Sequence, residues 1–202
     1  MLGGYGFTHD LDIKDSAKLI ERLRDQFHVQ LGSVLGKKCL LITECGAGIG
    51  RIAHSLLTKY YKRTDLLEPA ANLMAKAKES LKDNPNIGEF HQKGMEEFEF
   101  AQKYDTIWIQ WVIGYLTDND LLAFLHKCKD NLNTNGVVVI KDNACEHYGF
   151  ILDKSDCSIA RNVNYYNTIF NHAGYDVLLT ERFKEFPEDA MPIMKFVIRP
   201  RV

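Results

Sequence analysis

Apolar residues in this chain form two patterns that alternate along the sequence. In the first, they recur every three or four positions, as Leu19, Leu23 and Phe27 do, which is typical of helices with one buried face. In the second, they form short continuous runs, as at 137–140, which is typical of strands buried on both faces. The first pattern predicts helices over 15–29, 52–59, 69–82, 118–132 and 160–173. The second predicts strands over 39–43, 63–68, 89–92, 104–110, 137–140, 175–181 and 194–198.

This alternation of strands and helices predicts an α/β fold with a mostly parallel sheet and helices on both faces. The last two strands are joined without a helical crossover, so the final strand is predicted to be antiparallel. No repeat or linker divides the 202 residues, which we expect to form a single domain over 1–202. Residues 1–36 are predicted to form a loop and a helix, and residues 143–158 a polar loop.

The most distinctive local feature is a glycine-rich turn after the first strand. Glu44 ends an apolar run, and Gly46, Gly48 and Gly50 follow at alternate positions before Arg51 and a helix. Glycine lets the backbone turn sharply, and a strand that enters a helix through such a turn offers unpaired amides to a polar ligand. A dinucleotide fold would have G-x-G-x-x-G, and here the third glycine comes one residue early, which disfavours a nicotinamide enzyme. An ordinary turn between strand and helix remains the alternative.

Ligands of open α/β sheets bind at the carboxyl ends of the strands, so the residues there are candidates. Glu68 could accept hydrogen bonds from both hydroxyls of a ribose, or it could cap the helix that begins near Pro69. Arg51 lies at a helix start, where the dipole disfavours a cation; it either pairs with a ligand carboxylate or points to solvent. Gly94 and Met95 suit an adenine ring, or they form an ordinary turn.

A second group of candidates follows the fourth and fifth strands. Trp111 and Tyr115 could offer aromatic faces to a cation or to a flat apolar ring, although Trp111 could instead belong to the core. Asn143 ends the fifth strand and can both donate and accept hydrogen bonds. Asp153 and Asp156 lie three residues apart near a predicted helix start. They either cap that helix or form an acidic wall for a basic substrate.

Composition and charge narrow the classes of function. A net charge of -2 gives no reason to expect a nucleic-acid partner, and no apolar run approaches the roughly 20 residues that cross a bilayer. The first residues lack the charged and apolar regions of a signal peptide. The five cysteines are odd in number and show no C-x-x-C spacing, which favours reduced thiols inside a cell and no bound zinc.

Five segments carry a resemblance to a known family: 1–6, 44–51, 107–114, 116–118 and 139–143. They closely resemble the eukaryotic protein N-terminal α-N-methyltransferases, which methylate X-Pro-Lys/Arg N-termini. The match covers nearly the whole chain, and Trp-Ile-Gln-Trp-Val-Ile-Gly and Ile-Lys-Asp-Asn are more specific than the glycine turn. The resemblance implies a Rossmann-like class I methyltransferase fold with a seven-stranded sheet. It also implies S-adenosylmethionine (AdoMet) as methyl donor, S-adenosylhomocysteine (AdoHcy) as product, and protein N-termini as partners.

Residue by residue, the resemblance implies two sets of site residues. Asp156 is expected to accept the proton of the substrate amine, Asn143 to orient the N-terminal residue and Tyr115 to hydrogen-bond to the amine. The remaining peptide-binding residues would be Trp111 on the substrate proline, Asp153 on the basic third residue, and Ser158. The cofactor-binding residues would be Gly46, Gly48, Arg51, Glu68, Pro69, Gly94, Met95 and Gln110.

The chain departs from the family pattern at three places. Family members usually carry a helical lid upstream of Met-Leu-Gly-Gly-Tyr-Gly, which this chain is expected to lack. Tyr115 replaces a family histidine, and residues 190–192 read Ala-Met-Pro where the family has a peptide-binding tyrosine. Two alternatives therefore stay open: a non-catalytic AdoMet-binding or interaction protein, and a small-molecule N-methyltransferase. A nuclear or cytoplasmic location rests on the resemblance alone, and the sequence leaves oligomeric state, protein substrates and the number of methyls open.

Overall fold

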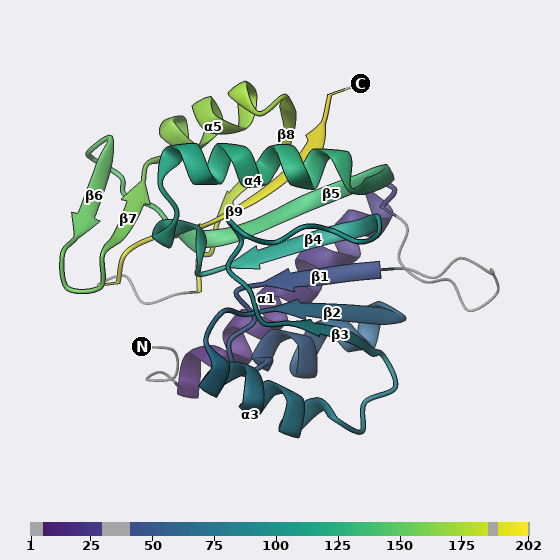
Figure 1. Cartoon of the computed structure of the whole chain (residues 1–202). Helices are drawn as coiled ribbons and strands as arrows, with labels where there is room; N and C mark the ends of the chain where they lie inside the picture. Colours follow the sequence, from purple (N-terminus) through teal and green to yellow (C-terminus); the bar gives the residue numbers. More distant parts are fainter. Residues whose placement is uncertain (1–5, 30–40, 186–189, 202) are drawn as a thin grey trace.

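A computed structural model describes residues 6–29, 41–185 and 190–201, and the structural statements below concern these residues. Its main feature is a seven-stranded sheet in the order β3-β2-β1-β4-β5-β9-β8 (Figure 1). The first five strands of this order pair in parallel, and β9 is antiparallel to both β5 and β8. The predicted mostly parallel sheet with an antiparallel last strand is thus confirmed. The strands are β1 (Leu41–Cys45), β2 (Arg63–Leu67), β3 (Ile87–His91), β4 (Tyr104–Gln110), β5 (Leu132–Asn143), β8 (Tyr175–Arg182) and β9 (Ile193–Pro200).

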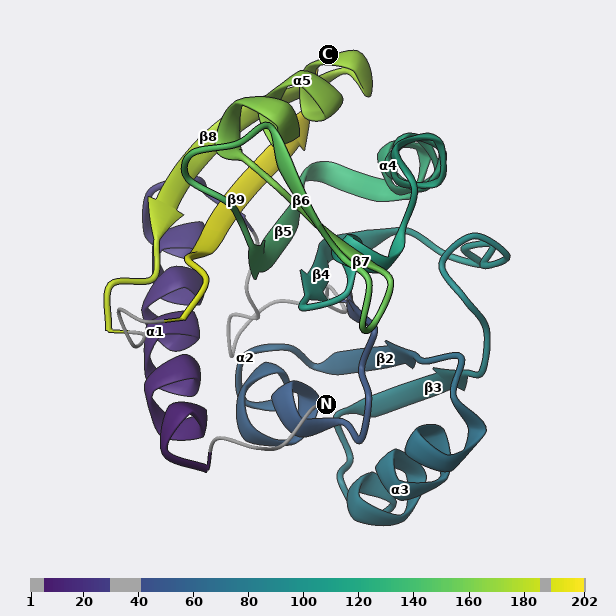
Figure 2. The same cartoon turned by 90° about the vertical axis from the view of Figure 1, so that its left-hand side faces the viewer.

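Helices cover both faces of this sheet, as predicted (Figure 2). In β5, Val137 and Val139 pack in the cluster that includes α1, whereas Val138 and Ile140 pack in the cluster that includes α4 and α5. This alternation explains why the run 137–140 is apolar at every position. None of the helices in the described segments is long and apolar enough to cross a membrane. The helices are α1 (Gly6–Asp25), η1 (Ala53–Leu57), α2 (Thr58–Tyr60), α3 (Ala71–Leu81), η2 (Ile113–Tyr115), α4 (Asp118–Asp130) and α5 (Val163–His172).

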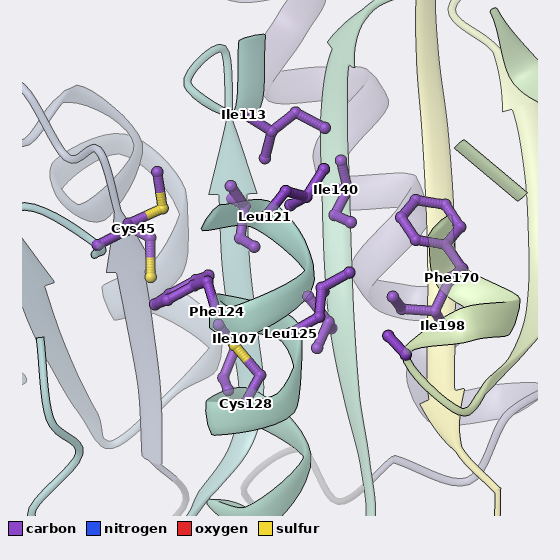
Figure 3. Packing of buried hydrophobic residues seen from close by; sticks show 14 of the residues in the cluster. Cys45, Ile107, Ile113, Leu121, Phe124, Leu125, Cys128, Ile140, Phe170 and Ile198 are labelled. Carbon is purple, nitrogen blue, oxygen red and sulfur yellow. The ribbon is translucent and has the colours of Figure 1, made fainter. Parts of the chain in front are cut away.

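The larger core lies between α4, α5 and the sheet (Figure 3). Leu121, Phe124 and Leu125 of α4 are at most 1% exposed and belong to the same cluster as Ile107 of β4 and Ile140 of β5. Burying an apolar side chain of this size contributes roughly 1.5–3 kcal/mol. The helix therefore holds β4 and β5 side by side, and with them the turns that leave their carboxyl ends.

The first helix begins earlier than the sequence pattern predicts. α1 starts at Gly6 instead of Asp15, so Phe7, assigned to a loop in the prediction, lies in the helix. The physical reason is that the first half of its buried face is polar, since Asp12 and Ser16 are both 0% exposed. An apolar period cannot reveal such a face. Gly32 and Gly36, which the sequence predicts to end this helix, and the first two residues of the strand predicted at 39–43 lie outside the described residues.

The helix after the glycine turn is confirmed, but its winding is unusual. Residues 53–57 form a π-helix between single α-helical turns. The Thr58 hydroxyl donates to the Ala53 carbonyl at 3.0 Å, and the Ala53 amide donates to Glu44 Oε2 at 2.9 Å. Such π-turns occur frequently at functional sites. Here the turn follows directly on the glycine segment.

The prediction of a loop over 143–158 was wrong. This region holds the strand β6 (Phe150–Asp153), which forms an antiparallel hairpin with β7 (Ser158–Arg161). The hairpin escaped detection because Phe150, Ile151 and Leu152 are consecutive and all exposed, so no alternation marks a buried face. The last helix accordingly begins at Val163 rather than Ala160, after the N-cap residue Asn162.

Candidate active site

The predicted site residues gather at the edge of the sheet where the parallel strands end. The arrowheads of β1 and β4 point toward this edge, on the left of Figure 1, and the β6–β7 hairpin stands beside it. Because parallel strands end at a common edge, turns that are distant in sequence meet there. The edge carries the glycine turn, the end of β2, the segment after β4 and the hairpin.

The glycine turn requires its glycines for two different reasons. Gly46, Gly48 and Gly50 all have left-handed backbones, with φ of +73°, +57° and +76°. A Cβ on Gly46 would lie 2.7 Å from the Val112 side chain, and one on Gly50 would lie 2.6 Å from Leu81 of α3. Side chains at these positions would be both strained and obstructed. The turn therefore packs closely between the end of α3 and the segment after β4.

Glu68 joins the glycine turn to the end of β2. Its Oε2 accepts from the Gly48 amide at 2.8 Å and its Oε1 from the Ala70 amide at 2.9 Å, and the residue is 6% exposed. The second contact is the helix-start interaction that the sequence left open. The contact with Gly48 holds the carboxylate against the glycine turn, where an acid could accept hydrogen bonds from the hydroxyls of a ribose. Each carboxylate oxygen can accept more than one hydrogen bond, so both roles are compatible.

Arg51 does not point freely to solvent. Its Nη2 lies 2.8 Å from Asp12 Oδ2, and its Nη1 lies 3.2 Å from Nδ1 of His9. The guanidinium also stands 5.3 Å from the centre of the Trp111 ring, within reach of a cation–π interaction. Arg51 thus connects α1 to the segment after β4. These partners offset the unfavourable position of a cation at a helix start.

The side-chain amide of Gln110 is hydrogen-bonded at both its oxygen and its nitrogen. Its Oε1 accepts from Trp108 Nε1 at 3.0 Å, and its Nε2 donates to the two carboxylate oxygens of Asp12 at 2.9 and 3.0 Å. Asp12 was missed in the sequence because it precedes the apolar stripe of α1. The signal that could have found it is the spacing from Asp12 to Ser16 to Leu19, which continues one helical face.

The remaining predicted cofactor residues lie around this group. Pro69 is exposed beside Glu68, and Gly94 is partly exposed after β3. Met95 is 5% exposed and packs in the core cluster on the α4 side. A Cβ on Gly94 would lie 2.7 Å from Glu96 Oε2, the end of a flexible side chain. Contacts of these three residues with an adenine stay a prediction.

Trp111 has a strained backbone held by its neighbours. Its φ of +54° is unusual for a bulky residue and costs about 1–3 kcal/mol. Its amide donates to the Lys141 carbonyl, while Asp142 Oδ2 accepts from the Val112 and Ile113 amides at 2.7 and 3.0 Å. Burial raises the pKa of Asp142 to about 6, and the hydrogen bonds from these amides oppose that rise. This anchoring explains how the indole is turned toward the site edge instead of the core.

The hairpin brings three more predicted residues together. Asp156 Oδ2 accepts from the Tyr115 hydroxyl at 3.2 Å, and its Oδ1 accepts from the Ser158 amide at 3.0 Å. Hydrogen bonds from Ser158 hold the pKa of Asp156 below its usual range. Burial and the nearby Asp156 carboxylate raise the pKa of Tyr115. At neutral pH the pair is therefore a carboxylate that accepts a phenol hydrogen bond.

Asp153 lies opposite Ser158 in the hairpin register, and its Oδ1 accepts from the amide and hydroxyl of Ser155 at 2.8 and 2.6 Å. Asp153 and Asp156 therefore shape a hairpin turn, and the prediction that they lie near a helix start was wrong. Both residues are exposed. Asn143 is also exposed, at the end of β5, where its carbonyl accepts from the Tyr166 hydroxyl at 3.2 Å.

These contacts connect the two predicted sets along one edge. Trp111 adjoins Arg51 on the cofactor side and shares a segment with Tyr115 on the hairpin side. Gly114 lets the hairpin approach, since a Cβ there would lie 3.2 Å from the Ile159 carbonyl. Trp111 and Arg51 therefore lie between two acidic groups. One is the hairpin turn with Asp153 and Asp156, and the other is Glu68, which is placed to accept hydrogen bonds from a ribose.

Comparisons with known proteins find related methyltransferases. A family model described as AdoMet-dependent proline di-methyltransferase matches residues 1–199. N-terminal Xaa-Pro-Lys N-methyltransferase 1-B of Xenopus laevis is 38% identical over 201 residues, which are 98% of this chain and 87% of that protein. Alpha N-terminal protein methyltransferase 1 of Dictyostelium discoideum is 40% identical over 98% of this chain and 72% of its own. A solved AdoMet-dependent methyltransferase from Leishmania major has a TM-score of 0.85 at 36% identity, covering 98% of this chain and 75% of that one.

Proposed function

The chain belongs to the AdoMet-dependent proline di-methyltransferase family, and from this membership we propose that it methylates the α-amine of protein N-termini of the X-Pro-Lys/Arg type. It is an enzyme with the class I methyltransferase fold, and AdoMet is its methyl donor. One observation supports this substrate class: over 98% of its length, the chain is more than a third identical in sequence to named N-terminal methyltransferases.

The residues at the cofactor edge fit AdoMet. The glycine turn has a left-handed backbone at Gly46, which glycine adopts without strain, and it lies beside Glu68 at the carboxyl end of the sheet. Glu68 is placed to accept ribose hydroxyls, and the Arg51 cation is suited to the carboxylate of the methionine moiety. When bound, AdoMet supplies an electrophilic methyl group on a sulfonium.

Selectivity for an α-amine begins with its pKa of about 7.7–8.0, which leaves a substantial fraction neutral near pH 7.5. A lysine amine, with a pKa of about 10.4, stays almost wholly protonated there. Asn143 and Asp156 then act as hydrogen-bond partners that orient the amine. Because Asp156 has a lowered pKa, it is a weak base, and we propose that it accepts the amine hydrogen bond and directs the proton to water.

The other predicted residues would bind the following side chains of the substrate. Trp111 would pack against the proline ring, and its rigid backbone keeps the indole in place. Asp153 would pair with the lysine or arginine in third position, which its exposed carboxylate can reach without a desolvation cost. Tyr115 donates to Asp156 and so keeps that carboxylate aimed at the site.

The experiment that tests this function is incubation of the chain with AdoMet and a Ser-Pro-Lys peptide, followed by mass spectrometry. We expect methyl groups on the α-amine, located by fragmentation, and none on the same peptide with an acetylated N-terminus. Intact AdoHcy binding without any transfer would indicate a non-catalytic binding protein. Transfer to small amines in competition with the peptide would indicate a small-molecule N-methyltransferase.

A further inference from the structure

The first helix is bound to the sheet by charged side chains. Lys141 of β5 and Lys195 of β9 lie directly opposite each other in the sheet register, and they are 0% and 4% exposed. Two buried like charges on neighbouring strands destabilise a sheet unless acids compensate them. Asp15 of α1 lies between them, 2.8 Å from the Lys141 ammonium and 2.6 Å from that of Lys195.

Asp12, one turn before Asp15, occupies the centre of this group. Besides Lys141 Nζ at 2.7 Å, its carboxylate receives Arg51 Nη2 at 2.8 Å and Gln110 Nε2 at 2.9 and 3.0 Å. Every one of these partners is a donor, and Asp12 is 0% exposed. Only an ionised carboxylate can accept all of them, because an amide in its place would direct an N–H group toward other donors.

Asp12 therefore contacts two cofactor-side residues that come from different segments of the chain. Arg51 comes from the turn after β1 and Gln110 from the end of β4, and each has its side-chain orientation set by the same carboxylate. Arginine loses rotamer entropy when it is fixed, and a partner that fixes it beforehand removes that cost from ligand binding.

The charges of this network indicate which kind of ligand group Arg51 would bind. In this network four cations face three carboxylates, which leaves one positive charge in excess. Two of the four cations, Lys141 and Lys195, are enclosed, and Arg22 is 36% exposed near the end of α1, where it pairs with Glu181. Arg51 is 30% exposed and directly follows the glycine turn. Of these two exposed cations, Arg51 is the one placed to meet an anionic group at the turn. The seven residues are Arg22, Arg51, Lys141, Lys195, Asp12, Asp15 and Glu181.

We propose that Asp12 is a positioning residue for the amino-acid end of AdoMet, which it serves through Arg51 and Gln110 without touching the ligand. The proposal rests on the proposed function. It makes the first helix part of the cofactor site, because the helix contributes the acid that orients both ligand-facing side chains. Asp15 shares the same helix and the same lysine but contacts neither Arg51 nor Gln110, so it provides a matched control.

The test compares two ligands that differ only at the amino-acid end. AdoHcy carries the carboxylate and the amine, and 5′-methylthioadenosine lacks both. Calorimetry on the full chain should show that Asp12→Asn weakens AdoHcy binding by about tenfold or more while changing 5′-methylthioadenosine binding by less than about threefold. Asp15→Asn should destabilise the fold to a similar extent but keep the wild-type ratio between the two ligands.

A double-mutant cycle completes the experiment. If Asp12 acts through the arginine, the losses in AdoHcy affinity from Asp12→Asn and Arg51→Met should not add in the double variant. Equal weakening of both ligands by Asp12→Asn, the same selective loss in Asp15→Asn, or additive losses in the cycle would each overturn the proposal. Failure of the wild-type chain to bind AdoHcy would overturn the proposed function together with it, which separates the two cases.

Discussion

Asp156 is the residue whose environment bears most directly on the reaction. Hydrogen bonds from Ser158, and a weaker one from the Tyr115 hydroxyl, stabilise its ionised form and lower its pKa. A carboxylate of this kind orients an amine well but takes its proton poorly. The substrate amine, with its pKa of about 8, therefore decides how much reactive neutral form is present at neutral pH.

The variant Asp156→Asn tests this role. We expect kcat with a Ser-Pro-Lys peptide to fall by about a hundredfold or more, because the charged acceptor of the amine is lost. AdoHcy affinity, measured by calorimetry, should stay near wild type, since Asp156 lies on the hairpin away from the glycine turn. Tyr115→Phe, which removes one hydrogen bond to the same carboxylate, should cost only about tenfold. Unimpaired turnover of the asparagine variant would remove Asp156 from the mechanism.

At the scale of single elements, the β6–β7 hairpin contributes the acidic part of the site but almost none of the core. Its position depends on contacts with the segment after β4 and with the start of α4. Arg161, at the end of β7, is 0% exposed; its guanidinium donates to Asp118 Oδ1 at 2.7–2.8 Å and to the Leu116 carbonyl at 2.9 Å. Gly114 allows the strand to approach within van der Waals contact.

Gly114→Ala should therefore shift the hairpin by a few tenths of an ångström, because the new Cβ would lie 3.2 Å from the Ile159 carbonyl. We expect kcat/KM for the peptide to fall by about tenfold, since small displacements of positioning groups are costly, while AdoHcy binding is preserved. Gly149→Ala is the control, because a Cβ there has no neighbour within 4 Å. Equal activities of the two variants would show that the hairpin position does not limit the reaction.

At the scale of the whole molecule, buried acids make stability depend on pH. Burial raises the pKa of Glu44 from 4.5 to about 8, and the Ala53 amide that donates to it opposes only part of that rise. The folded chain thus binds more protons at this site than the unfolded chain between about pH 4.5 and 8. Through Glu44 alone, the free energy of unfolding should fall as the pH rises across this window.

Glu44→Gln should remove this dependence, since a glutamine keeps an oxygen for the Ala53 amide but does not titrate. Denaturant unfolding gives the free energy of unfolding of both proteins at pH 5 and at pH 8. Between these two pH values, the free energy of unfolding of the wild type should fall by about 2–5 kcal/mol relative to that of the variant. Glu97→Gln, at an exposed position, should show no such difference. A difference between Glu44→Gln and wild type that is independent of pH would contradict the assignment.

The sequence by itself determined what depends on local pattern. The order of the strands in the main sheet and of the helices between them, the parallel pairing, the sharp turn at Gly46 and the acid after β2 all follow from periodicity and from residue types at fixed positions. The gathering of Glu68, Gln110, Trp111 and Asn143 at one edge also follows, because parallel strands end together. The family resemblance added roles for these residues, and the comparisons confirmed the family, the fold and the cofactor.

Only the tertiary structure decided which side chains pair across the fold. Asp12 and Gln110 are 98 positions apart, and their contact depends on how α1 docks on β4, which no local pattern encodes. The hairpin was missed for a related reason: β6 is exposed along its whole length and so leaves no alternation. The hairpin is positioned by the contacts of its Arg161 with Asp118 and of its Ile159 with Gly114. Periodicity reports which face of an element is buried, whereas the partner that a buried polar group finds there is set by the packing of the whole chain.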